Sequence, residues 1–190
     1  MQALRPLPKE AREVLDAVGA PPRLLVHLAL VHEVAFELIE AISTAWPGFP
    51  IDNHAVLVGA ATHDIGKAIH RDELHGPGRL HEQDGPAILR QHGFSEDLAR
   101  FARTHAQWAG EQPPTIEDLL VALANRIWVG ERIQRIEDAV IARLVDFSGE
   151  PLWSVFARFD EILLVILEGA GQRLAIYTRI AADENKPALN

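Results

Sequence analysis

The chain has 190 residues, of which 48% are hydrophobic, enough for one compact domain with a sizeable core. Charged residues make up 24% and the formal net charge is −9, so general binding to nucleic acids or to anionic membranes is not expected. There is no cysteine, which excludes disulfides, thiolate catalysis and thiolate metal ligands. The first ten residues lack the apolar run of a secretory signal, and no apolar stretch has the length of a membrane span, so we expect a cytoplasmic protein.

Hydrophobic periodicity predicts helices along most of the chain, and no stretch alternates like a β-strand. Apolar residues at steps of three and four predict a first long helix over about 22–45. Asp52 can cap a second, mostly apolar helix that runs to about Lys67. Residues 68–80 then form a predicted loop that is rich in charged residues and histidines, which is typical of the wall of a site.

Shorter helices are predicted in the middle of the chain, over about 81–92 and from a cap at Ser95 to about Trp108. Thr115 to Asp118 resembles a capping box that opens a helix of roughly thirty residues.

The remaining elements complete an all-α domain. After a break at 148–151, a long terminal helix is predicted to run to about Ala181. We therefore expect a single helical domain over 1–182, with a core over 22–147, a C-terminal helical extension over 150–181 and a frayed tail over 183–190.

The chemically most informative residues are the adjacent His63 and Asp64, which follow an apolar run. Burying them without partners is costly, so they either pair with each other structurally or hold a ligand. His27, His81 and His105 lie on other predicted helices, each on or near an apolar face. Interior histidines and carboxylates on facing helices build metal sites in helical bundles. Nitrogen and oxygen donors without sulfur suit a divalent Mn, Fe, Co, Ni, Zn or Mg ion.

Each of these residues also has a structural interpretation. His63 and Asp64 could be a hydrogen-bonded pair at a helix end, and His27 alone could be a satisfied core histidine. His81 and His105 could line the pocket and contact a phosphate group instead of binding the metal. The other histidines are predicted to be ordinary surface or loop residues: His32, His54, His70, His75 and His92.

Several basic residues are candidates for binding a phosphate oxygen. Lys67 lies about one turn after the doublet, where an ammonium group could act as a point charge, although a solvated lysine is the simpler interpretation. Weaker candidates of the same kind are Arg23, Arg79, Arg103 and Arg126.

The order of these residues resembles the HD-domain superfamily of metal-dependent phosphohydrolases. In that family, a histidine on one helix and a His-Asp doublet on another bind a divalent ion, and a later aspartate closes the site. The segment from His63 to Lys67 resembles the family's HDIGK version, and His81 and His105 resemble the extra histidines of many members. The resemblance spans about residues 23–130 and implies an HD-type helical bundle, on which we expect the long C-terminal helix to pack.

The chain departs from the family pattern at the closing position, where Asn125 stands in place of aspartate. The resemblance thus implies His27, His63, Asp64 and Asn125 as metal ligands. An amide oxygen can bind a hard cation but carries no charge, so we expect weaker binding and no tightly bound dinuclear centre. Asp118, two turns earlier, is a distant substitute, and helix capping explains it more simply.

The resemblance implies hydrolysis of a phosphomonoester or phosphoanhydride in a small molecule, with a nucleotide as the first candidate. Water activated by the metal would attack, Asp64 or His105 could accept its proton, and His81 and Lys67 would hold phosphate oxygens. One alternative is a nucleotide-binding or regulatory module that has lost its catalytic metal through Asn125. A more remote one is a di-iron oxygenase.

The terminal helical region carries no recognised motif. Its apolar stripe is typical of a helix packed on a core, but it could also support a homodimer. The stripe consists of Trp153, Phe156, Phe159, Leu163 and Leu167.

Overall fold

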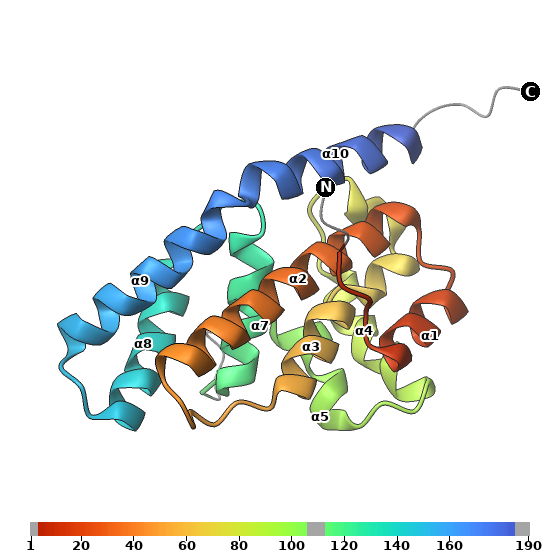
Figure 1. The fold of residues 1–190 in the computed structure, drawn as a ribbon. Coiled ribbons are helices and arrows are strands. Elements are labelled where there is room, and N and C mark those ends of the chain that lie inside the picture. The colour runs from red at the N-terminus through yellow and green to blue at the C-terminus, as the bar shows by residue number, and fades with distance from the viewer. Residues whose placement is uncertain (1–3, 106–112, 185–190) are drawn as a thin grey trace, which may run out of the picture.

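The computed structural model describes residues 4–105 and 113–184, and within these ranges it contains helices and no β-strand (Figure 1). The all-α prediction is confirmed. In chain order the elements are α1 (Lys9–Ala17), α2 (Pro22–Ala45), α3 (Asn53–Thr62), the 3-10 helices η1 (Ile65–Ala68) and η2 (Arg71–Leu74), α4 (Leu80–Gln91), α5 (Glu96–Ala99), α6 (Phe101–Thr104), α7 (Ile116–Ile127), α8 (Gln134–Ser148), α9 (Leu152–Glu168) and α10 (Ala170–Glu184).

Helix α2 is the central element of the fold. It packs against α3 and α7 on one side and against α9 and α10 on another, as Figure 1 shows. A helix covered on several sides must be apolar around most of its circumference, and eleven of the 24 residues of α2 are buried.

The buried hydrophobic residues form two clusters, and the candidate site lies where they meet. The larger cluster is built on α2, α3, α7, α8 and α9, and the smaller one on α1, the start of α2, η1 and α4. On α2, Val26 belongs to the larger cluster and Leu28 to the smaller one, with His27 between them. At the end of α3, Ala60 and Ile65 belong to different clusters in the same way, and His63 and Asp64 lie between them.

The predicted helix caps are confirmed. The Asp52 side chain accepts a hydrogen bond of 2.9 Å from the Ala55 amide at the start of α3, and Ser95 caps α5. Thr115 and Asp118 form a reciprocal capping box at the start of α7, so capping does account for Asp118.

Three predicted helices before residue 148 differ from the structure. The helix expected to reach Lys67 ends at Thr62, and a 3-10 turn follows. The helix expected after Thr115 is divided into α7 and α8, with Gly130 at φ 93° in the break between them. Residues 96–104 form two short helices, and the predicted continuation to Trp108 lies outside the described residues. Helix α1 was not predicted at all.

The predicted long C-terminal helix packs on the bundle but is interrupted at Gly169, between α9 and α10, and it extends to Glu184 instead of Ala181. Arg173 of α10 is almost fully buried and fixes this arrangement. Its guanidinium donates hydrogen bonds of 3.0 Å to the Trp128 carbonyl and 2.7 Å to the Ile166 carbonyl. These carbonyls lie at the ends of α7 and α9, where helices leave acceptors unsatisfied, so Arg173 joins three helices at one point.

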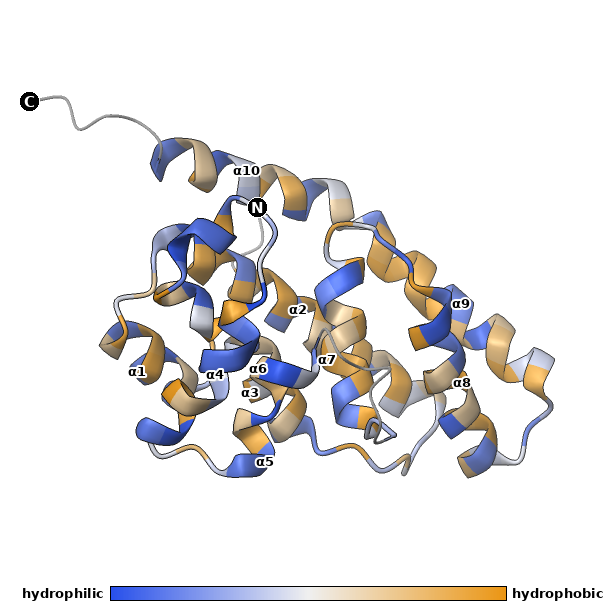
Figure 2. Ribbon diagram, turned by 180° about the vertical axis from the view of Figure 1, so that it is seen from behind, coloured by the Kyte–Doolittle hydropathy of each residue, from blue (hydrophilic) through white to orange (hydrophobic). Residues whose placement is uncertain are grey.

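Helix α9 is rich in hydrophobic residues (Figure 2), and several of them are exposed: Leu152, Trp153, Phe156, Leu164 and Val165. Of the predicted stripe, Phe159 and Leu163 are buried, whereas Trp153 is 74% exposed and Phe156 is 44% exposed. The stripe therefore divides into a core half and a solvent-facing half. In the described part of the chain, no helix combines the length and hydropathy needed to cross a membrane.

Candidate metal centre

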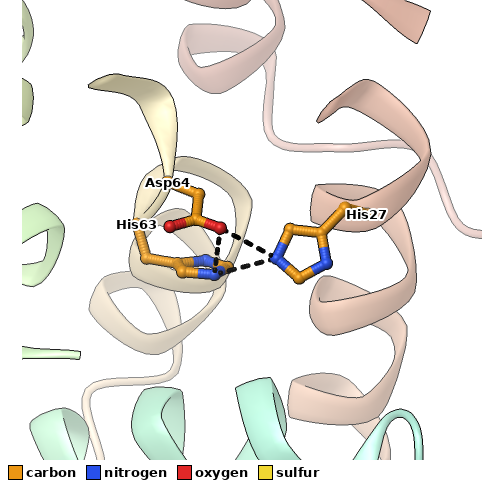
Figure 3. Close-up of side chains that lie close together, drawn as sticks. All are labelled: His27, His63 and Asp64. Carbon is orange, nitrogen blue, oxygen red and sulfur yellow. Dashed lines mark hydrogen bonds and ion pairs between the residues drawn. The ribbon is translucent and has the colours of Figure 1, made fainter. Parts of the chain in front are cut away.

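The His-Asp doublet lies at the end of α3 and is almost completely buried, with His63 0% and Asp64 1% exposed. His27 approaches it from α2 (Figure 3). The Nε2 atom of His27 lies 3.1 Å from Oδ2 of Asp64 and 3.2 Å from Nε2 of His63. These three side chains place one donor atom each within metal-binding distance of a common point.

A second group forms on the other oxygen of the same carboxylate. Oδ1 of Asp64 lies 3.2 Å from Nε2 of His81 and 3.4 Å from Nε2 of His105. His81 comes from the first turn of α4, and His105 follows α6. The four predicted histidines are therefore brought together around Asp64, two on each carboxylate oxygen.

The hydrogen bonds behind the rings show how these histidines are oriented. Nδ1 of His63 lies 3.0 Å from the Ala60 carbonyl, and Nδ1 of His105 lies 3.1 Å from the Phe101 carbonyl. A carbonyl oxygen only accepts, so each Nδ1 carries the proton. In the neutral rings the Nε2 lone pairs then face the carboxylate, which is how histidines are prepared for binding a metal.

This arrangement fits a cation. Within the described residues, Oδ1 of Asp64 is fully buried and has no hydrogen-bond partner. A buried carboxylate oxygen among imidazole nitrogens is unfavourable unless a positive charge compensates it. Burial disfavours the charged form of His81, but Asp64 and Glu73 outweigh it and raise the pKa of that ring. A divalent ion held by the same nitrogen and oxygen atoms would supply the positive charge in place of that proton. The residues present therefore suit a divalent ion held by nitrogen and oxygen donors.

The electrostatics of the cluster point the same way. Burial lowers the pKa of His63 well below its ordinary value and also lowers the pKa of His105, so both rings favour the neutral form that binds metals. Burial alone would raise the pKa of Asp64, but the surrounding imidazoles and the Lys67 ammonium outweigh it and hold the pKa well below the usual range. Asp64 is thus ionised.

Glu73 is a site residue that the sequence analysis missed. Its carboxylate lies 2.5 Å from Nδ1 of His81 and also accepts the backbone amides of Leu80 and His81. Burial opposes ionisation, but these hydrogen bonds lower the pKa of Glu73 to about 2. Glu73 therefore orients His81 as an outer carboxylate partner does in metal sites. Glu82, next to His81 in α4, is buried as well.

A basic pocket opens beside the cluster. Nζ of Lys67 lies 2.6 Å from Oδ2 of Asp64, and Lys67 and His81 line a pocket of about 640 Å³. Arg79 and Arg126 contribute two further positive charges to its wall. The structure thus brings three of the predicted lysine and arginine candidates for phosphate binding, together with His81, to one cavity. The pocket is lined by Lys67, Glu73, Gly76, Pro77, Gly78, Arg79, His81 and Arg126.

Asn125 lies half-buried on α7, one residue before Arg126 of the pocket. Trp128, three residues later on the same face of the helix, packs edge-on against the His27 ring with centroids 5.2 Å apart. Within the described residues, the Asn125 side chain makes no hydrogen bond to the cluster. Its role as a metal ligand therefore stays a prediction.

An aromatic wall lies beside the cluster on the His27 side, and no local pattern in the sequence predicted it. Tyr177 of α10 packs edge-on against Trp128 at 5.2 Å and lies 6.5 Å from the His27 ring, centroid to centroid. The wall places a residue of the C-terminal extension in contact with the candidate site.

The remaining candidates have other environments. The prediction that His32 is a surface residue is wrong, because it is 3% exposed and its Nδ1 has no hydrogen-bond partner in the described structure. His54 is exposed, and His70 pairs with Asp84. Arg103 is exposed on α6.

Comparisons with known proteins support the assignment of this site. The chain matches the family model of the HD domain over residues 24–127, which includes His27, the doublet, His81 and His105. It is also 33% identical over 128 residues to an uncharacterized protein of Methanocaldococcus jannaschii, covering 60% of this chain and 71% of that protein. No solved structure gave a significant match. The family match covers more than half of the chain and coincides with the histidine cluster, and the chain therefore belongs to the HD-domain family, a superfamily of metal-dependent hydrolases.

Proposed function

We propose that this protein is a metal-dependent phosphohydrolase that acts on a small phosphorylated molecule, with a nucleotide as the first candidate substrate. One observation carries the proposal: four histidine Nε2 atoms converge on a buried, ionised aspartate directly beside a pocket with three basic side chains. A metal cluster alone would suit many reactions. The adjoining positive charges favour a substrate that carries phosphate.

His27, His63 and Asp64 would hold the divalent ion, with Asn125 as a neutral fourth ligand. When bound, such an ion supplies Lewis acidity and lowers the pKa of a coordinated water. The second group, Asp64 with His81 and His105, offers a place for a second ion. Because Asp64 is the one carboxylate that the two residue groups have in common, we expect the second group to hold an ion less tightly than the first.

The chain's own residues would bind the substrate and move the proton. Lys67, Arg79 and Arg126 can neutralise phosphate oxygens that enter the pocket. Where the first group alone holds an ion, His105 is the candidate acceptor for the proton of the attacking water. Burial lowers its pKa, so it is neutral at pH 7, as a general base must be.

The test is hydrolysis of a panel of nucleotides and simple phosphate esters by the full-length protein, freed of metal and then supplied with Mn²⁺ or Mg²⁺. The proposal predicts release of inorganic phosphate that needs the added ion and is lost in the double variant Arg79→Gln/Arg126→Gln, while this variant keeps its metal. Hydrolysis without metal, or none on any member of the panel, would contradict it.

A second candidate is a binding or regulatory module on the same scaffold, and Asn125 favours it because the family's closing carboxylate is missing there. It predicts tight nucleotide binding without turnover in the presence of Mn²⁺ or Mg²⁺. A cytoplasmic location and a homodimer stay predictions from the sequence.

A further inference from the structure

The C-terminal helix α10 lies outside the segment matched by the HD-domain model, yet it touches the candidate site. It packs along α2, and its Tyr177 stands against Trp128 and the His27 ring. Figure 1 shows α10 lying over the N-terminal part of α2, and the bounds of α2 place His27 in that part. A helix added to the family's core therefore forms part of the surroundings of the metal ligands.

Arg23, in the first turn of α2, connects this helix to the pocket. Its Nε donates a 2.8 Å hydrogen bond to the Tyr177 hydroxyl, and its Nη1 lies 2.9 Å from Nδ1 of His75. Its backbone amide donates to the Glu184 carboxylate at 2.7 Å. One guanidinium thus holds both α10 and the residue that follows η2.

His75 begins the segment whose next residues, Gly76, Pro77, Gly78 and Arg79, line the basic pocket. This segment is exposed and lies between η2 and α4. Glycine adds backbone freedom, so an untethered stretch of this composition would sample many conformations and would have to be ordered on binding. A fixed contact at its first residue reduces that cost.

We propose that Arg23 is a positioning residue that, together with Tyr177 of α10, holds the 75–79 loop in place as a wall of the phosphate pocket. Arg23 does not line the pocket, and it acts through His75. The planar guanidinium is suited to this role because it donates in two directions at once, which a lysine ammonium on a flexible stem does less well. We call the contacts of Arg23 with Tyr177 and His75 the tether. The expected effect of the tether on phosphate binding rests on the proposed function, whereas the existence of the tether does not.

The experiment uses the full-length, Mn²⁺-loaded protein and the variants Arg23→Gln and Tyr177→Phe. Tyr177→Phe keeps the aromatic ring and removes only the hydroxyl that accepts from Arg23. Arg179→Gln is the matched control, since Arg179 is an exposed arginine on α10, the helix that carries Tyr177. Three quantities are measured: bound Mn²⁺, hydrogen–deuterium exchange of residues 75–79, and affinity for inorganic phosphate by calorimetry.

We expect both variants to keep their Mn²⁺, to exchange faster at 75–79 and to bind phosphate about fivefold more weakly, while Arg179→Gln behaves like the wild type. Unchanged exchange at 75–79 in Arg23→Gln would overturn the tether. Faster exchange with unchanged phosphate affinity would overturn its effect on the pocket. Absence of phosphate binding in the wild type would count against the proposed function, and exchange in the variants would still decide the tether.

Discussion

Replacing Glu73 by glutamine tests whether the orientation of His81 depends on an outer carboxylate. The two Glu73 oxygens accept three hydrogen bonds: one from the Leu80 amide and two, at the other oxygen, from the amide and the Nδ1 of His81. Glutamine has the same shape but only one acceptor oxygen, so its NH₂ group must face an N–H donor. The variant therefore loses at least one hydrogen bond and leaves an N–H donor of the first turn of α4 without its acceptor.

Loss of such an outer partner costs about 10–100-fold in metal affinity, which is about 1.4–2.7 kcal/mol. We expect the loss in the group formed by Asp64, His81 and His105. The group containing His27 should be affected less, because Glu73 does not contact it.

Calorimetric titration of the metal-free protein with Mn²⁺ measures this affinity. Asp72→Asn is the matched control, since Asp72 is an exposed carboxylate in the same 3-10 helix. Metal affinity of Glu73→Gln equal to that of the wild type and of Asp72→Asn would refute the reasoning.

Three further predictions concern stability, measured as the free energy of unfolding in urea. Gly66→Ala should lose about 2–3 kcal/mol, because the new Cβ would lie 2.3 Å from a backbone oxygen of α4. Gly76→Ala is the control, since its Cβ would enter open space, and it should change the stability by less than about 0.5 kcal/mol. His32→Leu should flatten the pH dependence of stability. Burial lowers the pKa of His32, so below about pH 6.5 the unfolded chain gains a proton that the folded chain does not. As the pH falls, the wild type should therefore lose up to about 1.4 kcal/mol of stability per pH unit more than the variant does. Arg173→Met should lose about 2–4 kcal/mol because buried helix-end carbonyls lose their donor, while Arg179→Met should stay within about 0.5 kcal/mol. Equal stability losses in Gly66→Ala and Gly76→Ala would contradict the first prediction. A pH profile of His32→Leu that runs parallel to that of the wild type would contradict the second, and equal stabilities of Arg173→Met and Arg179→Met would contradict the third.

Local rules predicted the parts of the fold that depend on neighbouring residues. The caps at Asp52 and Thr115 follow from side chains that reach amides three residues away. The His63–Asp64 doublet was recognisable because two polar residues in an apolar run need partners. All four histidines predicted around it do meet there.

Long-range contacts decided the parts that could not be predicted. The turn after Thr62 accompanies the close approach of Gly66 to the backbone of α4, which no local pattern reveals. Glu73 comes from a charged loop without periodicity, and only the folded chain brings it beneath His81. Tyr177 lies 150 positions after His27 along the chain, outside the family's segment.

His32 shows how angular reasoning alone misleads. It lies about 140° around the helix from His27, which correctly places it away from the metal site. A side chain of α2 that faces away from the metal site can still be buried, because other helices cover α2 on several sides. The neighbours Leu30, Val31 and Val34 are all fully buried and carried this signal in the sequence.

The central claim is that the cluster around Asp64 binds a metal ion, and elemental analysis of protein purified without chelator tests it most directly. We expect at least one equivalent of a divalent transition metal or magnesium in the wild type and less than a tenth of that in Asp64→Ala, with Asp72→Ala as the control that keeps its metal. Asp64→Ala protein that folds and retains the wild-type metal content would contradict the account.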